Sequence, residues 1–132
     1  MSSGGESGVY DGNCHCGAVR YTVKLSPPLP EYVVTQCNCS VCTKIGYLLV
    51  YPSIDDFTST RGEDQLKEYR FGSKRRPHRM CGNCGCSILI DLSETGQNTY
   101  ALNVRMFKDV DLDKFKYKYV DGKNLALPQY EI

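Results

Sequence analysis

The chain has 132 residues, with 16 lysines and arginines against 15 aspartates and glutamates, which gives a formal net charge of +1. That length is typical of a single domain, and a hydrophobic share of 41% is typical of a globular protein rather than a disordered one. The balanced charge argues against a dedicated nucleic-acid-binding protein, which needs an excess of basic residues, and no apolar run approaches the roughly 18 residues that a membrane span requires.

The first segment, residues 1–9, is rich in glycine, serine and glutamate, and it predicts a flexible N-terminal tail. It lacks the positively charged start and the apolar middle of a secretory signal. We therefore expect a cytoplasmic protein in which residues 10–132 form a single domain.

The next segments predict short strands. At 19–25 valine, tyrosine and leucine alternate with arginine, threonine and lysine, which is typical of a strand with one face in water. Segments rich in valine, tyrosine and leucine at 31–36 and 47–51 predict two more strands. Between these two, residues 40–45 predict one short helical turn that stops at Gly46.

Three further strands are predicted at 65–71, 86–92 and 99–104, separated by turns that contain glycine. At 114–119 lysines alternate with aromatic residues, which predicts a strand whose lysines face water and discourage association between sheet edges. No strand is followed by the long helical pattern that a βαβ unit needs, and no glycine-rich phosphate loop is present. The sequence therefore predicts a mainly β fold, either a sandwich or an open barrel-like arrangement of small sheets, and disfavours nucleotide chemistry.

Eight cysteines lie in three clusters. Closely spaced thiols in a chain without an export signal favour metal binding over a disulfide framework. The first cluster is Cys14 and Cys16, the second is Cys37, Cys39 and Cys42, and the third is Cys81, Cys84 and Cys86.

The first and third clusters each stand in a turn flanked by glycine, which allows the backbone to aim two sulfurs at one point. Together Cys14, Cys16, Cys81 and Cys84 supply the four thiolates of a closed tetrahedral zinc site. Four sulfurs leave no position open for a substrate, so the sequence predicts a zinc that holds the fold together.

The middle cluster offers three thiols on a turn that enters a helix. Three protein ligands with an exchangeable fourth position are typical of catalytic zinc, so Cys37, Cys39 and Cys42 are candidate catalytic residues and ligands of a second zinc. Two other interpretations stay open at this point. The cluster is a second structural site, completed by Cys86, His15 or His78, or it is three reduced cysteines without a metal.

These clusters also carry a resemblance. The order Gly-x-Cys-His-Cys-Gly-Ala-Val-Arg-Tyr, Cys-Asn-Cys-Ser-x-Cys-x-Lys-x-Gly and Cys-x-x-Cys-Gly resembles the glutathione-dependent formaldehyde-activating enzyme family, which includes the centromere-protein-V-like proteins. The resemblance implies a zinc-stabilised β-tent of stacked antiparallel sheets with little helix. It implies a structural zinc on the first and third clusters and active-site cysteines in the middle one. Cys86 is an additional thiol to which the resemblance gives no role.

The resemblance further implies a carbon–sulfur lyase that joins or separates a thiol, typically glutathione, and a carbonyl compound such as formaldehyde. A larger glutathione conjugate is a further candidate substrate. The alternative from another class is a zinc-stabilised module without catalysis, which binds a protein or nucleic acid. A small-molecule thiol is the partner we expect, with no membrane and no nucleic acid, and the sequence does not give the oligomeric state.

A basic stretch precedes the third cluster. Guanidinium groups bind carboxylates through two hydrogen bonds, and glutathione carries two carboxylates, so Arg76 and Arg79 are candidate substrate-binding residues. The simpler interpretation of such a stretch is a solvated loop. His15, between two expected zinc ligands, is better explained as a turn residue than as a catalytic base.

Overall fold

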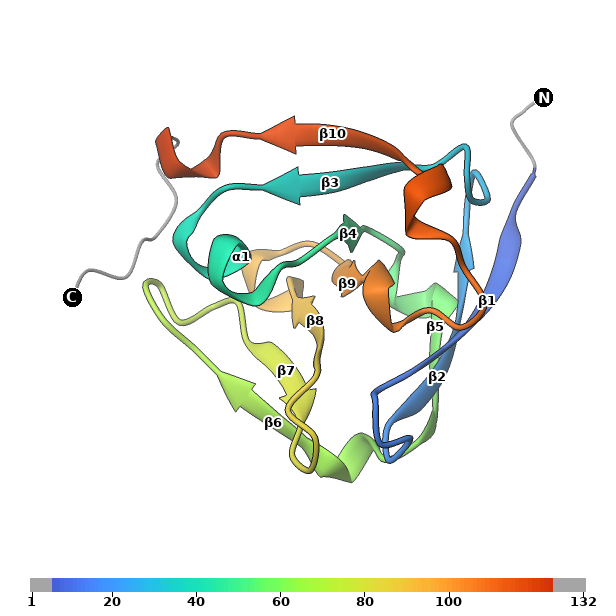
Figure 1. Ribbon diagram of the computed structural model, residues 1–132. Coiled ribbons are helices and arrows are strands. Elements are labelled where there is room, and N and C mark those ends of the chain that lie inside the picture. The colour runs from blue at the N-terminus through green and yellow to red at the C-terminus, as the bar shows by residue number, and fades with distance from the viewer. Residues whose placement is uncertain (1–5, 125–132) are drawn as a thin grey trace.

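The computed structural model describes residues 6–124, and it contains two β-sheets and one short α-helix (Figure 1). The strands are β1 (Gly8–Asn13), β2 (Arg20–Leu25), β3 (Val33–Cys37), β4 (Leu49–Val50), β5 (Phe57–Arg61), β6 (Leu66–Tyr69), β7 (His78–Cys81), β8 (Ser87–Asp91), β9 (Tyr100–Asn103) and β10 (Lys116–Val120), and the helix is α1 (Ser40–Ile45). Short 3₁₀ turns lie at Ile54–Asp56, Glu63–Gln65, Ser93–Thr95, Val104–Met106, Leu112–Lys114 and Gly122–Asn124. The predicted mainly β fold with little helix is confirmed.

The smaller sheet has the strand order β1-β2-β5 and is antiparallel throughout. In β2 the predicted alternation holds, since Tyr21, Val23 and Leu25 are buried while Arg20 is exposed. The ring of Tyr21 stacks on Phe57 of β5 with centroids 4.8 Å apart. A tyrosine ring in this position needs a glycine on the neighbouring strand, because a Cβ on Gly12 of β1 would overlap the Tyr21 ring.

The larger sheet has the order β10-β3-β4-β9-β8-β7-β6. In Figure 1 β10 and β3 run along the top and β6 and β7 lie at the lower left, so this sheet is strongly bent. Its pairings are antiparallel except that of β10 with β3, which is parallel. The expectation of antiparallel sheets is therefore wrong at this edge, because a connection of nearly 80 residues lets the last strand approach from either direction.

The core fills the space between the two sheets. Tyr21 and Leu25 of the small sheet pack with Val34, Ile88 and Leu102 of the large one, each at most 1% exposed. Burying a large apolar side chain completely contributes about 2–3 kcal/mol relative to leaving it in water. These strands therefore form a rigid frame for the turns that carry cysteines.

Several differences from the sequence expectations concern polar segments. Strands β1, β5 and β7 were not expected, because glycine, serine, threonine and basic residues interrupt their apolar pattern. Strand β1 begins at Gly8, inside the stretch 1–9 expected to be a tail, of which residues 1–5 lie outside the described part. The last residues of the expected domain, 125–132, also lie outside it.

Helix α1 occupies the predicted residues and ends as predicted at Gly46, whose φ of 80° is the left-handed conformation that glycine adopts without strain. One turn and a half is too short to be stable alone, so packing of its buried Cys42 against the large sheet must hold it. Within residues 6–124 no helix is long and apolar enough to cross a membrane.

Candidate metal centres and the adjoining pocket

The structure brings Cys14, Cys16, Cys81 and Cys84 together from two turns that are 65 positions apart in sequence. All four Sγ atoms lie within 4.8 Å of one another, and the Sγ–Sγ distances are 3.6 Å for Cys14–Cys16 and 3.7 Å for Cys16–Cys81. A tetrahedral zinc with bonds of about 2.3 Å places its sulfurs about 3.8 Å apart. The four-sulfur cluster therefore fits a zinc ion, and none of the eight cysteines of the chain forms a disulfide.

Backbone N–H groups surround these sulfurs. Val19 N donates to Cys14 Sγ at 3.3 Å, and Asn83 N and Cys84 N donate to Cys81 Sγ at 3.4 Å. Burial raises the pKa of Cys14 to about 11, so at neutral pH a thiolate there needs a cation beside it. The chemistry of these cysteines and the distances between their sulfurs therefore both indicate a metal site.

Cys86 is not a member of the four-sulfur cluster. Its backbone carbonyl accepts from Cys81 N at 2.9 Å, which fixes the turn between β7 and β8, and its side chain is half-buried beside Cys84. Cys86 therefore supplies a natural comparison for tests of the four ligands, since it is a cysteine of the same turn outside the cluster.

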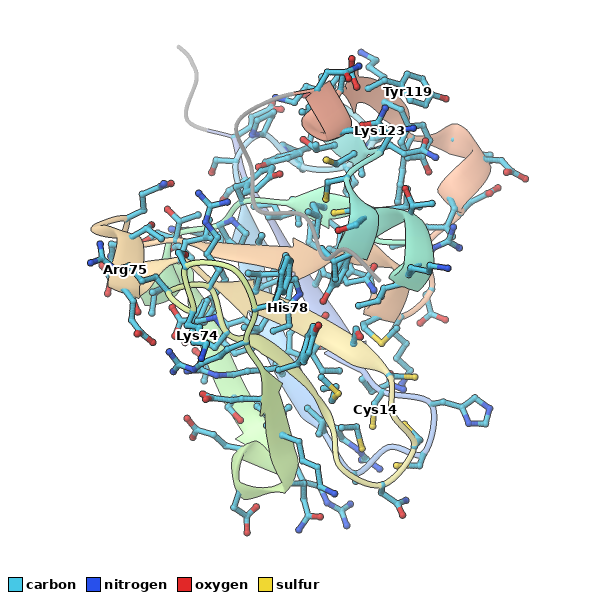
Figure 2. All side chains as sticks on the ribbon, turned by 90° about the vertical axis from the view of Figure 1, so that its left-hand side faces the viewer. Cys14, Lys74, Arg75, His78, Tyr119 and Lys123 are labelled. Carbon is cyan, nitrogen blue, oxygen red and sulfur yellow. The ribbon has the colours of Figure 1, made fainter. Side chains whose placement is uncertain are left out.

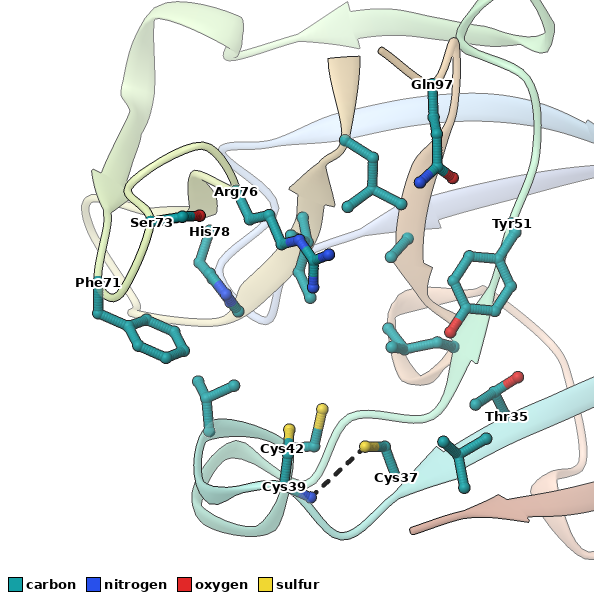
Figure 3. A pocket seen from close by; sticks show the side chains of 16 residues that line it. Thr35, Cys37, Cys39, Cys42, Tyr51, Phe71, Ser73, Arg76, His78 and Gln97 are labelled. Carbon is teal, nitrogen blue, oxygen red and sulfur yellow. Dashed lines mark hydrogen bonds between the residues drawn. The ribbon is translucent and has the colours of Figure 1, made fainter. Parts of the chain in front are cut away.

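The middle cluster also forms a compact group. Cys37 ends β3, Cys39 is the N-cap residue of α1 and Cys42 lies inside α1. The three Sγ atoms lie within 4.8 Å of one another, and Cys39 N donates to Cys37 Sγ at 3.4 Å (Figure 3). Among the residues that the structure describes, no further cysteine, histidine or carboxylate joins this trio.

The segment after β10 holds the loop that carries the trio. Asn38 donates through its side chain to Asp121 at 2.9 Å and accepts from Lys123 N at 3.0 Å. Its backbone N–H also donates to the Val120 carbonyl at 3.1 Å. The parallel β3–β10 pairing therefore positions Cys37 and Cys39, which flank Asn38 in the sequence.

A pocket of about 220 Å³ opens beside the trio (Figure 3). Its lining residues come from α1, the larger sheet and the loops after β6 and β8: Thr35, Cys37, Cys39, Val41, Cys42, Leu49, Tyr51, Phe71, Ser73, Arg76, His78, Ile90, Leu92, Gln97, Ala101 and Val120. Cys37 and Cys42 also line a second hollow, of about 380 Å³, that includes Arg105 and Asp121. Two hollows of the surface therefore adjoin residues of the trio.

One histidine of the pocket is buried and hydrogen-bonded to a tyrosine. His78 is 3% exposed, and burial lowers its pKa to about 4, so the ring is neutral at physiological pH. Tyr47, which is also buried, places its hydroxyl 2.9 Å from His78 Nδ1. Burial raises the pKa of Tyr47, so the phenol keeps its proton, and which of the two groups donates this hydrogen bond depends on the tautomer of the His78 ring. In the tautomer with its proton on Nε2, Tyr47 donates to Nδ1 and His78 offers a neutral N–H donor.

The two candidate arginines have different surroundings. Arg79 is bound on β7 by Asp91 at 2.9 Å and Glu68 at 3.2 Å, and it does not line the pocket. Arg76 lines the pocket and extends into it in Figure 3, and within residues 6–124 no carboxylate pairs with it. Arg76 is therefore available to bind a ligand, whereas Arg79 already pairs with carboxylates of the protein itself.

The rest of the basic stretch is a surface loop. Figure 2 shows Lys74 and Arg75 pointing outward, and both are exposed. Arg70 fixes this loop by donating to the Lys74 carbonyl at 2.9 Å and pairing with Glu94 at 2.9 Å. His15 belongs to neither cysteine group, in line with the turn role expected for it.

Comparison with known proteins identifies a matching family model and a similar solved structure. A family model described as "Glutathione-dependent formaldehyde-activating enzyme" matches residues 9–120, a range that contains both cysteine groups. The crystal structure of a protein from Rhodobacter sphaeroides, described as a structural genomics target, is similar with a TM-score of 0.69 and 27% sequence identity. That similarity covers 82% of this chain and 99% of the other chain.

Proposed function

The chain belongs to the glutathione-dependent formaldehyde-activating enzyme family, and from this premise we propose that it is a zinc-dependent carbon–sulfur lyase. Its substrates are a thiol, glutathione in the first instance, and a carbonyl compound, or the conjugate of the two. The observation that carries the proposal is the difference between the two sulfur groups. Four sulfurs can saturate one ion, while three sulfurs beside a pocket leave a coordination position for a substrate.

The residues of the trio, Cys37, Cys39 and Cys42, would hold the second zinc. When bound there, zinc supplies a Lewis acid that lowers the pKa of a substrate thiol and attracts its sulfur. In the direction of joining, the thiol loses its proton to solvent, the sulfur–carbon bond forms, and the carbonyl oxygen takes up a proton. The reverse direction releases the thiol and the carbonyl compound.

Two residues of the pocket have roles in the proposed reaction. Arg76 binds a carboxylate of the thiol through its guanidinium group, and this is the part of the arginine prediction that the geometry supports. His78 donates from Nε2 to the oxygen that becomes negative as the sulfur–carbon bond forms. This role requires the tautomer in which Tyr47 donates to Nδ1 and the ring proton lies on Nε2.

The four-sulfur cluster has a structural role in the proposal. It joins the turn after β1 to the turn after β7, and so it connects the smaller sheet with the larger one. All eight cysteines are free, which fits the reducing cytoplasm as the place where the protein works.

The test uses zinc-loaded protein, glutathione and formaldehyde, with NMR exchange spectroscopy to measure how fast the hydroxymethyl conjugate forms and dissociates. Cys39→Ser should lower the catalysed rate at least about 100-fold, because it removes a ligand of the reacting site. Its circular dichroism spectrum should match that of the unchanged protein. Cys86→Ser is the matched control and should retain the rate.

The competing class, a module without catalysis, gives a different result. It predicts two zinc ions that do not exchange and no acceleration with any thiol and carbonyl pair. The enzyme instead predicts one zinc that resists a chelator and a second that is removed or substituted more easily, since only three protein ligands hold it. Zinc analysis after graded chelation therefore separates the two.

A further inference from the structure

The pocket beside the trio is larger and more apolar than a one-carbon substrate requires. Its volume is about 220 Å³, and at about 30 Å³ for each water-sized group it has room for about seven non-hydrogen atoms. Formaldehyde contributes one carbon and one oxygen, so it would leave most of this space to water.

The walls of the pocket identify what fits there. Leu49, Ile90 and Ala101 come from three neighbouring strands of the larger sheet, and Phe71 and Leu92 come from the loops beside it. Ile90 and Ala101 are 7% and 2% exposed, and they belong to the smaller cluster of buried residues that also contains Cys39 and Cys42. Apolar walls of this kind stabilise an apolar ligand by removing its surface from water.

Glutathione itself is the wrong occupant for this space. It is a tripeptide with charged ends and two amide groups, and burying these groups without partners costs several kcal/mol. Besides the cysteines, the polar side chains of the pocket are those of Thr35, Tyr51, Ser73, Arg76, His78 and Gln97, and none of them is a carboxylate that could pair with the ammonium group of glutathione. The peptide part must therefore lie outside the apolar portion, with only its sulfur at the trio.

We propose that the carbonyl substrate of this enzyme is an aldehyde that carries an apolar group of about three to five carbons, and that this group occupies the pocket between Leu49, Phe71 and Leu92. This inference rests on the proposed lyase function and names the class of its second substrate. The step joins the thiol sulfur to the aldehyde carbon, the S–H proton leaves to solvent, and the aldehyde oxygen becomes a hydroxyl by taking up one proton.

The geometry also gives the aldehyde oxygen a partner. His78 and the cysteine trio line the same pocket, and the neutral His78 ring offers Nε2–H as a donor in the tautomer whose Nδ1 accepts from Tyr47. A neutral donor among apolar walls suits a carbonyl oxygen, because it offers one hydrogen bond without placing a charge against the apolar group.

The first experiment measures binding and does not depend on turnover. S-alkylglutathiones, from S-methyl to S-butyl, are stable thioethers that present the same peptide with a longer apolar group, and calorimetry on zinc-loaded protein gives their dissociation constants. We expect affinity to rise about threefold to fourfold with each added methylene, which is the gain for complete burial of that group. A flat series, in which S-methyl and S-butyl bind equally, overturns the inference.

Variants of Leu92 test the location. Leu92 is half-buried and lines the pocket, so both a larger and a smaller side chain should fold, as circular dichroism will show. Leu92→Phe should reduce the advantage of S-butyl over S-methyl to below about threefold, whereas Leu92→Ala should extend the rise to S-hexyl. Val9→Phe, at a position 72% exposed on β1, is the matched control and should leave the series unchanged. Equal losses for short and long ligands in Leu92→Phe contradict the proposed location.

A second measurement separates this inference from the function on which it rests. The enzyme should accelerate the reaction of glutathione with pentanal more than with formaldehyde, measured as kcat/KM by NMR exchange. Acceleration with formaldehyde but no gain with pentanal overturns the inference and leaves the lyase function standing. No acceleration with any aldehyde overturns the lyase function, and this inference falls with it.

Discussion

Replacing Cys16 by serine should weaken the fold far more than its exposed position suggests. Cys16 is an exposed ligand, so Cys16→Ser creates no cavity in the core, and its effect reports the loss of the metal tie alone. The tie joins positions 65 residues apart, and closing a loop of that length lowers the entropy of the unfolded chain by an amount worth about 4 kcal/mol. A domain of ordinary stability has only about 5–15 kcal/mol in total.

Urea unfolding followed by circular dichroism measures this effect. With a dependence of about 2 kcal/mol per molar urea, a loss of 4 kcal/mol moves the midpoint down by about 2 M. Cys86→Ser and Cys39→Ser should each move it by less than about 0.5 M, because neither residue belongs to the four-sulfur cluster. Equal shifts in Cys16→Ser and Cys86→Ser would refute the assignment of the four ligands, and an equal shift in Cys39→Ser would refute the division between a structural and a reacting site.

Three further predictions concern basic residues in the pocket or on the strand beside it. Arg76→Gln should raise KM for glutathione about 10-fold to 100-fold with little change in kcat or in the unfolding midpoint, because a charged hydrogen bond to a carboxylate is lost; an unchanged KM in steady-state kinetics would remove Arg76 from substrate binding. Arg79→Gln should instead lower the free energy of unfolding by about 2–3 kcal/mol in urea, since it leaves Asp91, 7% exposed, without its cation, and a stable variant with raised KM would reverse the two roles. The pKa of His78 falls from 6.5 in the unfolded chain to about 4 in the folded protein, so the unfolded state takes up the proton first and stability should decrease by about 2–3 kcal/mol as pH falls from 6.5 to 4. His78→Gln should remove that part of the pH dependence in thermal unfolding, and an unaltered profile would show that another group causes it.

The sequence predicts those parts of the molecule in which local pattern and burial agree. The alternation at 19–25 survives as β2 because one face of that strand lies in the core, and the helical turn at 40–45 survives as α1 because Gly46 can take a positive φ. The spacing of the cysteines likewise anticipates the two groups that the fold brings together.

Long-range pairing could not be predicted from local pattern. The pattern of the basic stretch predicts a solvated loop, yet the stretch contains the start of β7. There His78 is buried and Arg79 forms an ion pair with Asp91 of the neighbouring strand β8. Whether an arginine meets a ligand or a carboxylate of its own protein depends on which strands are neighbours. The same holds for Tyr47, since its bond to His78 spans 31 positions and no motif connects the two residues.

The place of β10 beside β3 has a consequence for how the protein is made. Chains leave the ribosome from the N-terminus at roughly 5–20 residues per second, so all of the cysteines emerge before Val120, which pairs with Cys37 and accepts from Asn38. During that interval of several seconds the trio lacks the strand that holds its loop. The newly made thiols are then at their most vulnerable to oxidation or to capture of the wrong metal, and completing translation is what ends this exposure.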